Sequence, residues 1–269
     1  MLKHKFQPYK YWSLVLIITW IAGLFAAYFS YQESLSNLQI PFILLGMFTP
    51  FIISMFMIYG SKNDKLKSDF KNRIFNLTLV KPKYWVFIFL IMPITLLLAT
   101  LISLLFGQPI EQFLFAPELA STGAEIIIIL IILILAPTFE ELGWRGYGID
   151  SLKKEKTIFR ATMTYALLWN IWHLPLFAIN GYYQNELLHM NFIYALNFVL
   201  SLIPAAFLMN WVYYKNNRSI IAIILLHMML NLFSVLFQTE QFTKIIITLL
   251  FTILSITIFF KDKTFFMKK

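Results

Sequence analysis

Apolar runs long enough to cross a lipid bilayer recur along the whole chain. A helix needs about 20 apolar residues for this, because each residue advances it by about 1.5 Å. Runs of this length occur at residues 12–30, 40–59, 84–106, 124–143, 158–180, 191–214, 219–237 and 244–260. The runs therefore predict an all-α, polytopic membrane protein with eight transmembrane helices.

The composition points to the same class of protein. Of the 269 residues, 59% are hydrophobic and 13% are charged, which is more apolar than the core of a soluble protein of this length requires. The connections between the runs are too short to hold a soluble module, so we expect one integral membrane domain over residues 1–269. The chain has no cysteine, which excludes disulfides, thiolate catalysis and a zinc site built on sulfur.

Lysine and arginine are confined to alternate connections. All of the 22 basic residues except Lys244 lie in the N-terminal tail, residues 60–83, 144–160, 215–218 and the C-terminal tail. By the positive-inside rule these segments, and with them both termini, are cytoplasmic. This topology and the attraction to anionic headgroups account for the net charge of +9. We therefore expect the lipid bilayer, and not nucleic acid, as the partner of the basic residues.

Two adjacent carboxylates stand at the inner end of the run at 124–143. Glu141 and Arg145 are four residues apart, so they share a helix face and can pair. Glu140 is rotated by about 100° from Glu141 and has no such local partner. Ionised groups at the edge of a lipid-facing helix are costly unless they are paired or solvated in a cavity. Glu140 is therefore a candidate functional group.

Polar residues also interrupt two other apolar helices. His173 ends the stretch LLWNIWH, with Trp169 one turn before it, and His227 has Asn231 four residues on. A single intramembrane histidine or asparagine often only joins neighbouring helices by a hydrogen bond. Carboxylates, two histidines and an asparagine on three helices instead indicate one water-containing cavity. Their depth along the helices predicts a cavity inside the bundle that is open to the cytoplasmic side.

Three short motifs resemble those of the CAAX-protease and bacteriocin-processing family of intramembrane proteins. EELGWR at 140–145 resembles its EExxxR motif, WNIWH at 169–173 its FxxxH motif, and HMMLN at 227–231 its HxxxN motif. The resemblance covers residues 124–235 and departs from the family pattern only at Trp169, where phenylalanine is usual. Within the family the chain is most similar to the type II CAAX prenyl endopeptidases.

The resemblance implies an activity, a class of substrate and a location. The expected enzyme is an intramembrane endopeptidase that hydrolyses the peptide bond after a prenylated cysteine and releases the C-terminal tripeptide. Its partners are then prenylated C-terminal peptides or proteins, and Trp169 is a candidate contact for them. The expected location is the cell membrane of a prokaryote or the endoplasmic reticulum of a eukaryote.

The residue types suggest how such a reaction proceeds. No serine or cysteine in the cluster is placed to act as a nucleophile, so hydrolysis requires an activated water. Glu140 is the candidate general base, and His173 is expected to orient the water and protonate the leaving amine. His227 and Asn231 are donors suited to stabilising the oxyanion. Glu141 and Arg145 are expected to brace the helix, with contact between Arg145 and the substrate carboxylate as the alternative.

Other interpretations remain open at this point. Two histidines and two glutamates can in principle bind zinc, but the sequence lacks the paired-ligand HExxH motif, so we favour a mechanism without metal or other cofactor. A non-catalytic family member that binds peptides, or acts as an immunity or scaffold protein, would carry the same motifs. A transporter also places ionisable residues in the membrane, but no inverted repeat is evident.

Overall fold

The computed structural model of the chain describes residues 5–117 and 124–269. These residues are almost all helical, and an isolated antiparallel bridge between Phe115 and Phe237 is the one β-type contact among them. The predicted all-α class is thereby confirmed. Six helical segments of the described residues are long and apolar enough to cross a membrane: Pro8–Ser30, Glu33–Tyr59, Pro82–Leu104, Ile126–Lys153, Phe192–Lys215 and Gln241–Lys261.

The other two apolar runs form shorter helices. Helix α8 covers Ile158–His173 and helix α11 covers Ile220–Val235, with 16 residues each. Sixteen residues advance a helix by about 24 Å, less than the hydrocarbon thickness of about 30 Å. The α-helical part of the run at 158–180 ends at His173, and Pro175 follows in the short 3-10 helix η5 (Leu174–Ala178). Among the described residues six helices are long enough to span the membrane. The predicted count of eight spans therefore stays a prediction.

The chain divides into two compact units, which we describe separately. The first unit contains residues 1–72, 139–207 and 262–269, and the second contains residues 73–138 and 208–261. The expectation of a single domain over residues 1–269 stays a prediction. Helix α7 (Ile149–Lys153) belongs to the first unit and the 3-10 helix η2 (Leu77–Leu79) to the second, while α3 (Asp64–Phe75) and α10 (Phe192–Lys215) have residues in both.

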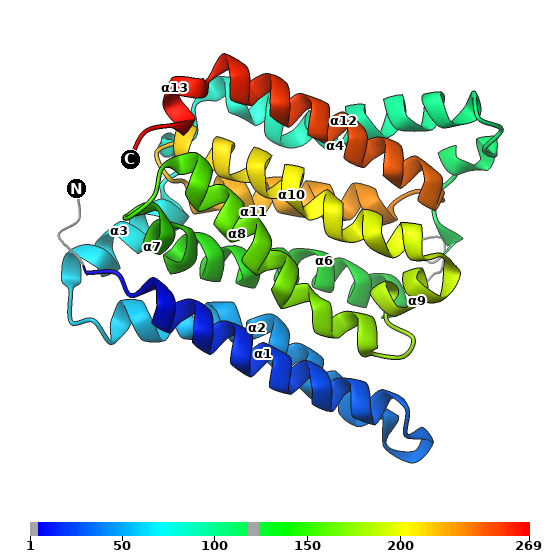
Figure 1. Cartoon of the computed structure of the whole chain (residues 1–269), viewed down its shortest axis with the longest axis horizontal. Helices are drawn as coiled ribbons and strands as arrows, with labels where there is room; N and C mark the ends of the chain where they lie inside the picture. The colour runs from blue at the N-terminus through cyan, green and yellow to red at the C-terminus, as the bar shows by residue number, and fades with distance from the viewer. Residues whose placement is uncertain (1–4, 118–123) are drawn as a thin grey trace. The chain divides into compact units, whose positions relative to one another are not determined.

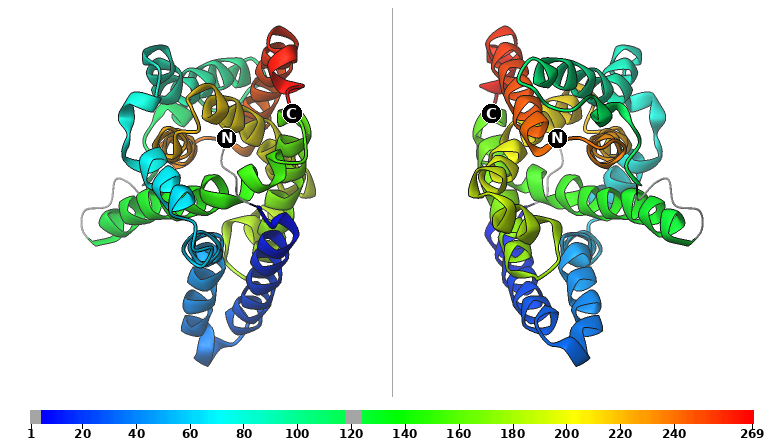
Figure 2. Two further views of the ribbon diagram at one scale, coloured as in Figure 1. Left: turned by 90° about the vertical axis from the view of Figure 1, so that its left-hand side faces the viewer. Right: turned by 90° about the vertical axis from the view of Figure 1, so that its right-hand side faces the viewer.

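A helical hairpin forms one part of the first unit. Helices α1 (Pro8–Ser30) and α2 (Gln39–Tyr59) lie side by side in Figure 1 and are joined by η1 (Glu33–Leu38), at the end of the hairpin in Figure 2. The ring of Phe42 stacks on Phe25 and Phe29. Farther along, the Thr19 hydroxyl donates to the carbonyl of Gly46 at 3.4 Å. Aromatic stacking and a small residue at the crossing hold the two helices together.

The segment with the adjacent glutamates packs closely against this hairpin. Helix α6 (Ala124–Gly143) continues into a π-helical turn, η4 (Trp144–Gly148). A Cβ atom at Gly143 would lie 2.5 Å from the backbone carbon of Pro50 in α2, and one at Gly146 would lie 2.7 Å from the Ser54 hydroxyl. These two glycines are needed because any side chain there would push the segment away from α2.

Helix α8 is joined to α1 by indole hydrogen bonds. Trp20 of α1 donates to the carbonyl of Ile171 at 3.0 Å, and Trp172 of α8 donates to the Thr19 hydroxyl at 3.1 Å. At the other end of α8, the N–H of Ile158 donates to the carbonyl of Lys268, after the terminal helix α13 (Lys263–Phe266). Both ends of the helix that carries His173 are therefore anchored within the first unit.

Three helices of the second unit pack together. Helix α4 (Pro82–Leu104) packs against both α11 and α12 (Gln241–Lys261). Gln112, in the 3-10 helix η3 (Ile110–Phe113), connects two of them. Its amide nitrogen donates to Ser103 of α4 at 3.2 Å, and its oxygen accepts from Thr243 of α12 at 2.5 Å. This buried amide ties the connection after α4 to the start of α12.

We predict that Gly143→Ala destabilises the protein although alanine is the better helix former. The added methyl group must displace the backbone of α2, and overpacking of this kind costs about 1–3 kcal/mol. Thermal unfolding in detergent measures the effect. Gly46→Ala is the matched control, because a Cβ there meets only the Thr19 methyl group at 3.6 Å, an ordinary contact. Equal melting temperatures for the two variants would contradict the close packing at Gly143.

Candidate functional site

Glu141 and Arg145 form a buried ion pair, as their spacing predicted. Arg145 Nη1 lies 2.6 Å from Glu141 Oε2, and both side chains are fully buried. The same guanidinium nitrogen donates to the Tyr165 hydroxyl at 2.8 Å, and the guanidinium carbon lies 4.7 Å from the centre of that ring. The pair thus links the end of α6 to α8 through a tyrosine that the sequence analysis did not identify.

The helix that carries the EELGWR motif does not stay a regular α-helix to its end. From Trp144 to Gly148 it is π-helical, with the N–H of Ile149 donating to the carbonyl of Trp144, five residues back. All five residues of the turn are buried. Single π-turns within α-helices occur frequently at functional sites. The motif spacing did not indicate this turn, because an α-helix and a π-helical turn place Glu141 and Arg145 equally close in the sequence.

Glu140 accepts hydrogen bonds from two indole groups. Its side-chain oxygen Oε2 lies 3.5 Å from Nε1 of Trp144 and 3.4 Å from Nε1 of Trp169, and the residue is 7% exposed. No ion-pair partner was expected for Glu140 within its own turn, but a hydrogen-bond donor was missed there. Trp144, four residues on, is a neutral donor and not a counter-ion, so charge spacing does not reveal it.

His173 lies among aromatic rings at the end of α8. Its Nδ1 is 2.8 Å from the carbonyl oxygen of Trp169. Because a carbonyl only accepts, Nδ1 carries the proton in this bond, and Nε2 is the acceptor of the neutral ring. The rings of Trp172 and Phe198 meet the imidazole edge-on, at 4.6 and 5.5 Å between centres. His173 and Glu140 are thus both in contact with Trp169.

Tyr182 also belongs to the surroundings of Glu140. It precedes the short helix α9 (Tyr183–Met190) and packs against Ala26, Ala27 and Ile179. Burial raises the pKa of its phenol, and the negative charge of Glu140 raises it further. The phenol therefore keeps its proton and lies within electrostatic reach of the carboxylate. The spacing of the motifs does not indicate Tyr182, because it lies in the connection between η5 and α9 and reaches Glu140 only through the fold.

His227 and Asn231 lie in the second unit, on α11. They are four residues apart on one face of the helix, as predicted. His227 is 5% exposed, and Asn231 is partly buried. The structure thus brings Glu140, Glu141, Arg145, Trp169 and His173 together within the first unit, and His227 with Asn231 within the second.

The site residues are not arranged as a metal cluster in the part of the chain that the structure describes. No group of three or more His, Asp or Glu side chains there is placed to hold a metal ion. Within the first unit, Glu140 accepts hydrogen bonds from the indole N–H groups of Trp144 and Trp169.

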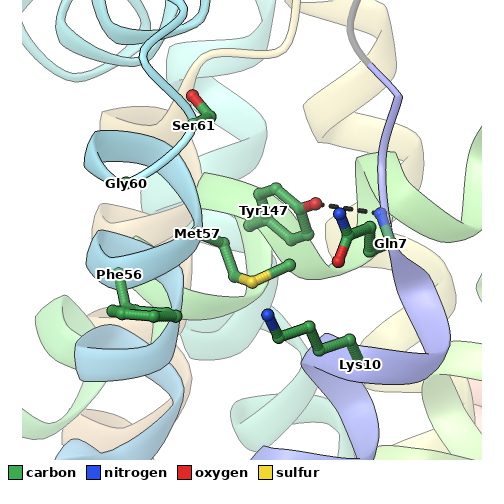
Figure 3. Close-up of a pocket in the computed structure, with 7 residues that line it drawn as sticks. All are labelled: Gln7, Lys10, Phe56, Met57, Gly60, Ser61 and Tyr147. Atoms are coloured by element: carbon green, nitrogen blue, oxygen red, sulfur yellow. Dashed lines mark hydrogen bonds between the residues drawn. The ribbon is translucent and has the colours of Figure 1, made fainter.

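A surface cavity of about 260 Å³ lies on another side of the π-helical turn. It is lined by Gln7, Lys10, Phe56, Met57, Gly60, Ser61 and Tyr147 (Figure 3). The backbone N–H of Gln7 donates to the Tyr147 hydroxyl at 2.9 Å and closes one wall. None of the predicted site residues lines this cavity, so it is separate from the surroundings of Glu140.

Known proteins share both the motif region and the full length of the chain. The sequence model of a family described as type II CAAX prenyl endopeptidase Rce1-like matches residues 122–233, which include all the predicted site residues. The chain is also 40% identical over 266 residues to CAAX prenyl protease 2 of Methanococcus maripaludis, and the alignment covers 98% of each protein. The similarity therefore extends through the hairpin and the last helices, outside the motifs.

We predict that Glu141→Gln lowers the stability of the protein substantially. Removing one partner of a fully buried ion pair leaves the charge of Arg145 uncompensated, which costs about 3–5 kcal/mol. The melting temperature in detergent should fall accordingly. Asp64→Asn is the control, because it breaks the pair of Asp64 with Lys67, in which the Asp64 side chain is 94% exposed, and such pairs contribute little. An unchanged melting temperature for Glu141→Gln would show that the buried pair does not stabilise the fold.

Proposed function

Because the chain belongs to the family of type II CAAX prenyl endopeptidases, we propose that it cleaves its substrates with a water molecule activated by Glu140 and His173. The chain is a CAAX prenyl endopeptidase, a peptide hydrolase with apolar helices suited to a membrane. The evidence for this activity is the similarity to CAAX prenyl protease 2 over nearly the whole chain. The observation that carries the mechanism is the buried carboxylate of Glu140, which shares a contact with His173 through Trp169.

The first step is proton transfer from water to Glu140. The resulting hydroxide attacks the carbonyl carbon of the peptide bond after the prenylated cysteine and forms a tetrahedral intermediate. His173 orients the water, for which the acceptor at Nε2 is suited when Nδ1 donates to the backbone. Collapse of the intermediate breaks the C–N bond, and a proton returned through His173 or Glu140 completes the amine of the released tripeptide.

His227 and Asn231 are the proposed donors to the oxyanion. Their spacing presents an imidazole and an amide from one face of α11, and both groups can donate a hydrogen bond to a developing negative charge. Preorganised donors of this kind typically contribute about 3–4 kcal/mol each to the stability of the transition state.

Glu141 and Arg145 are proposed to brace the site. The pair is fully buried, and Arg145 also contacts Tyr165. These contacts favour bracing over the alternative, in which Arg145 meets the substrate carboxylate, because the fully buried guanidinium would have to become accessible for that role.

The proposed reaction uses neither a metal ion nor another cofactor. Zinc in catalytic sites typically has three protein ligands, and the sequence offers no helix with two of them on one face. The indole N–H groups that contact Glu140 are suited to a carboxylate that accepts hydrogen bonds.

The proposed topology has eight spans with the catalytic cavity open to the cytoplasm. The confinement of the basic residues to alternate connections supports it, with α8 and α11 as short spans whose flanking residues complete the crossing. Both termini are then cytoplasmic. We propose the cell membrane as the location, because the relative comes from a prokaryote, Methanococcus maripaludis. The proposed substrates are prenylated C-terminal peptides or proteins.

We predict that Glu140→Gln abolishes cleavage of a farnesylated CAAX peptide, while the variant stays folded and binds the peptide. The amide cannot accept the proton of the water, but it keeps the shape of the side chain. Release of the tripeptide, peptide affinity and melting temperature are measured together. The assay contains a strong chelator, and the wild-type turnover should be unaffected by it.

The outcomes separate the competing mechanisms. Full turnover by Glu140→Gln would exclude Glu140 as the base. Loss of wild-type turnover in chelator, restored by added zinc, would favour the metal-dependent alternative. Glu141→Gln serves as the comparison, because it should lose stability and retain part of the activity.

For the topology, we predict that cysteines introduced at Ser68 and Glu186 react with a membrane-impermeant thiol reagent from opposite sides of sealed vesicles. Both residues are exposed, and the chain has no cysteine of its own to compete. Detergent permeabilisation provides the control, because both positions should then react. Labelling of both positions from one side of intact vesicles would refute the eight-span topology.

A further inference from the structure

Two tryptophans from separate helical segments meet on one oxygen of Glu140. Trp144 comes from the π-helical turn and Trp169 from α8, and both indole nitrogens lie within 3.5 Å of Oε2. Both distances are at the long end for a hydrogen bond. Their convergence on the same atom is nevertheless specific, because two donors approaching from different elements restrict the rotation of the carboxylate more than one does.

The two indoles are themselves held in place by other rings. Trp144 is fully buried and stacks on Trp12, with 5.1 Å between the ring centres and 7° between the planes. Trp169 is 3% exposed and stacks on Tyr165 at 5.7 Å and 17°. The Tyr165 ring also meets the edge of Trp144. Neither indole can turn without disrupting this stack, so the positions of both N–H groups are well defined.

The choice of indole as donor has a chemical consequence. An indole N–H can only donate, and it carries no charge. It therefore orients a carboxylate without neutralising it, in contrast to the guanidinium that pairs with Glu141. The two adjacent glutamates of α6 thus have different kinds of partner. Glu141 is paired with a cation. The two indole N–H groups that hold Glu140 are neutral, and they leave it able to accept a proton during the reaction.

We propose that Trp144 and Trp169 are positioning residues that hold the carboxylate of Glu140 in the orientation required to take a proton from water. The inference rests on the proposed role of Glu140 as the base. It gives Trp144 a role that its motif position did not suggest, and it places Trp169 behind the carboxylate instead of against the substrate. Loss of either N–H should lower the turnover number and leave the Michaelis constant unchanged.

The test removes each N–H while keeping the ring. Site-specific replacement of Trp144 or Trp169 by 3-benzothienylalanine puts sulfur in place of the N–H group and retains the size and stacking of the indole. A tryptophan with a purely packing role tolerates this exchange. Turnover number, Michaelis constant and melting temperature are measured for each variant with a farnesylated CAAX peptide.

Two other tryptophans provide matched controls. The Trp12 nitrogen is buried and has no hydrogen-bond partner among the described residues, so the exchange removes no bond there. The Trp20 nitrogen donates to the carbonyl of Ile171 at 3.0 Å, so the exchange removes a bond that does not involve Glu140. Both replacements should leave the turnover number unchanged.

We expect the turnover number to fall about tenfold for either single replacement at 144 or 169, and about a hundredfold for both together, since small misplacements of a catalytic group can cost about that much. The Michaelis constant should stay within a factor of about two, and the melting temperature should match that of the Trp12 control. A wild-type turnover number in both single variants, with Glu140→Gln inactive, would overturn the proposal and leave the role of Glu140 intact.

Other results also decide between the roles. A raised Michaelis constant with unchanged turnover for the Trp169 replacement would show that Trp169 binds substrate. Activity of Glu140→Gln would instead remove the proposed base itself. Should a tryptophan replacement fail to fold, ultraviolet resonance Raman spectra of the wild type and Glu140→Ala report on the same bonds. Loss of the acceptor should shift the N–H marker of the indoles, and identical spectra would overturn the proposal.

Discussion

The burial of charge at the end of α6 is the constraint on which the site depends. Glu141 and Arg145 lie at 2.6 Å from one another with no exposed surface, and each would be costly to bury without the other. The pair spans the junction between the α-helix and the π-helical turn, and its contact with Tyr165 extends to α8. The position of Glu140 relative to α8 follows from this arrangement, because Glu140 is covalently adjacent to a residue that cannot move independently.

Close packing of the same segment against the α1–α2 hairpin reinforces that position. Gly143 and Gly146 allow the backbone to approach α2, and Trp12 of α1 stacks on Trp144. Trp144 in turn donates to Glu140. A hairpin that contains none of the sequence motifs is thus connected to the carboxylate of Glu140 through one stacked pair of rings. The similarity to the Methanococcus protein extends over this hairpin as well, which agrees with a structural contribution from outside the motifs.

Much of the candidate site was predictable, because its determinants are local. The pairing of Glu141 with Arg145 follows from the helical period, and the common face of His227 and Asn231 follows from the same rule. The extent of the α-helix in the run at 158–180 was less predictable. The run stays largely apolar to its end, but Pro175 cannot supply a backbone donor, and the α-helix gives way to a 3-10 turn after His173.

The sequence by itself determined the helical class, the positions of the polar groups along apolar helices and the pairing of Glu141 with Arg145. Each of these follows from the period of the helix and from the cost of a charge in an apolar medium. The tertiary structure alone decided that Trp144 and Trp169 meet on Glu140, that the turn at Trp144–Gly148 is π-helical and that Tyr182 lies near the carboxylate. The contacts of Glu140 with Trp169 and Tyr182 join segments that are distant in the chain. Trp144 is only four residues from Glu140, but a neutral aromatic donor leaves no signal in a sequence already rich in aromatic residues.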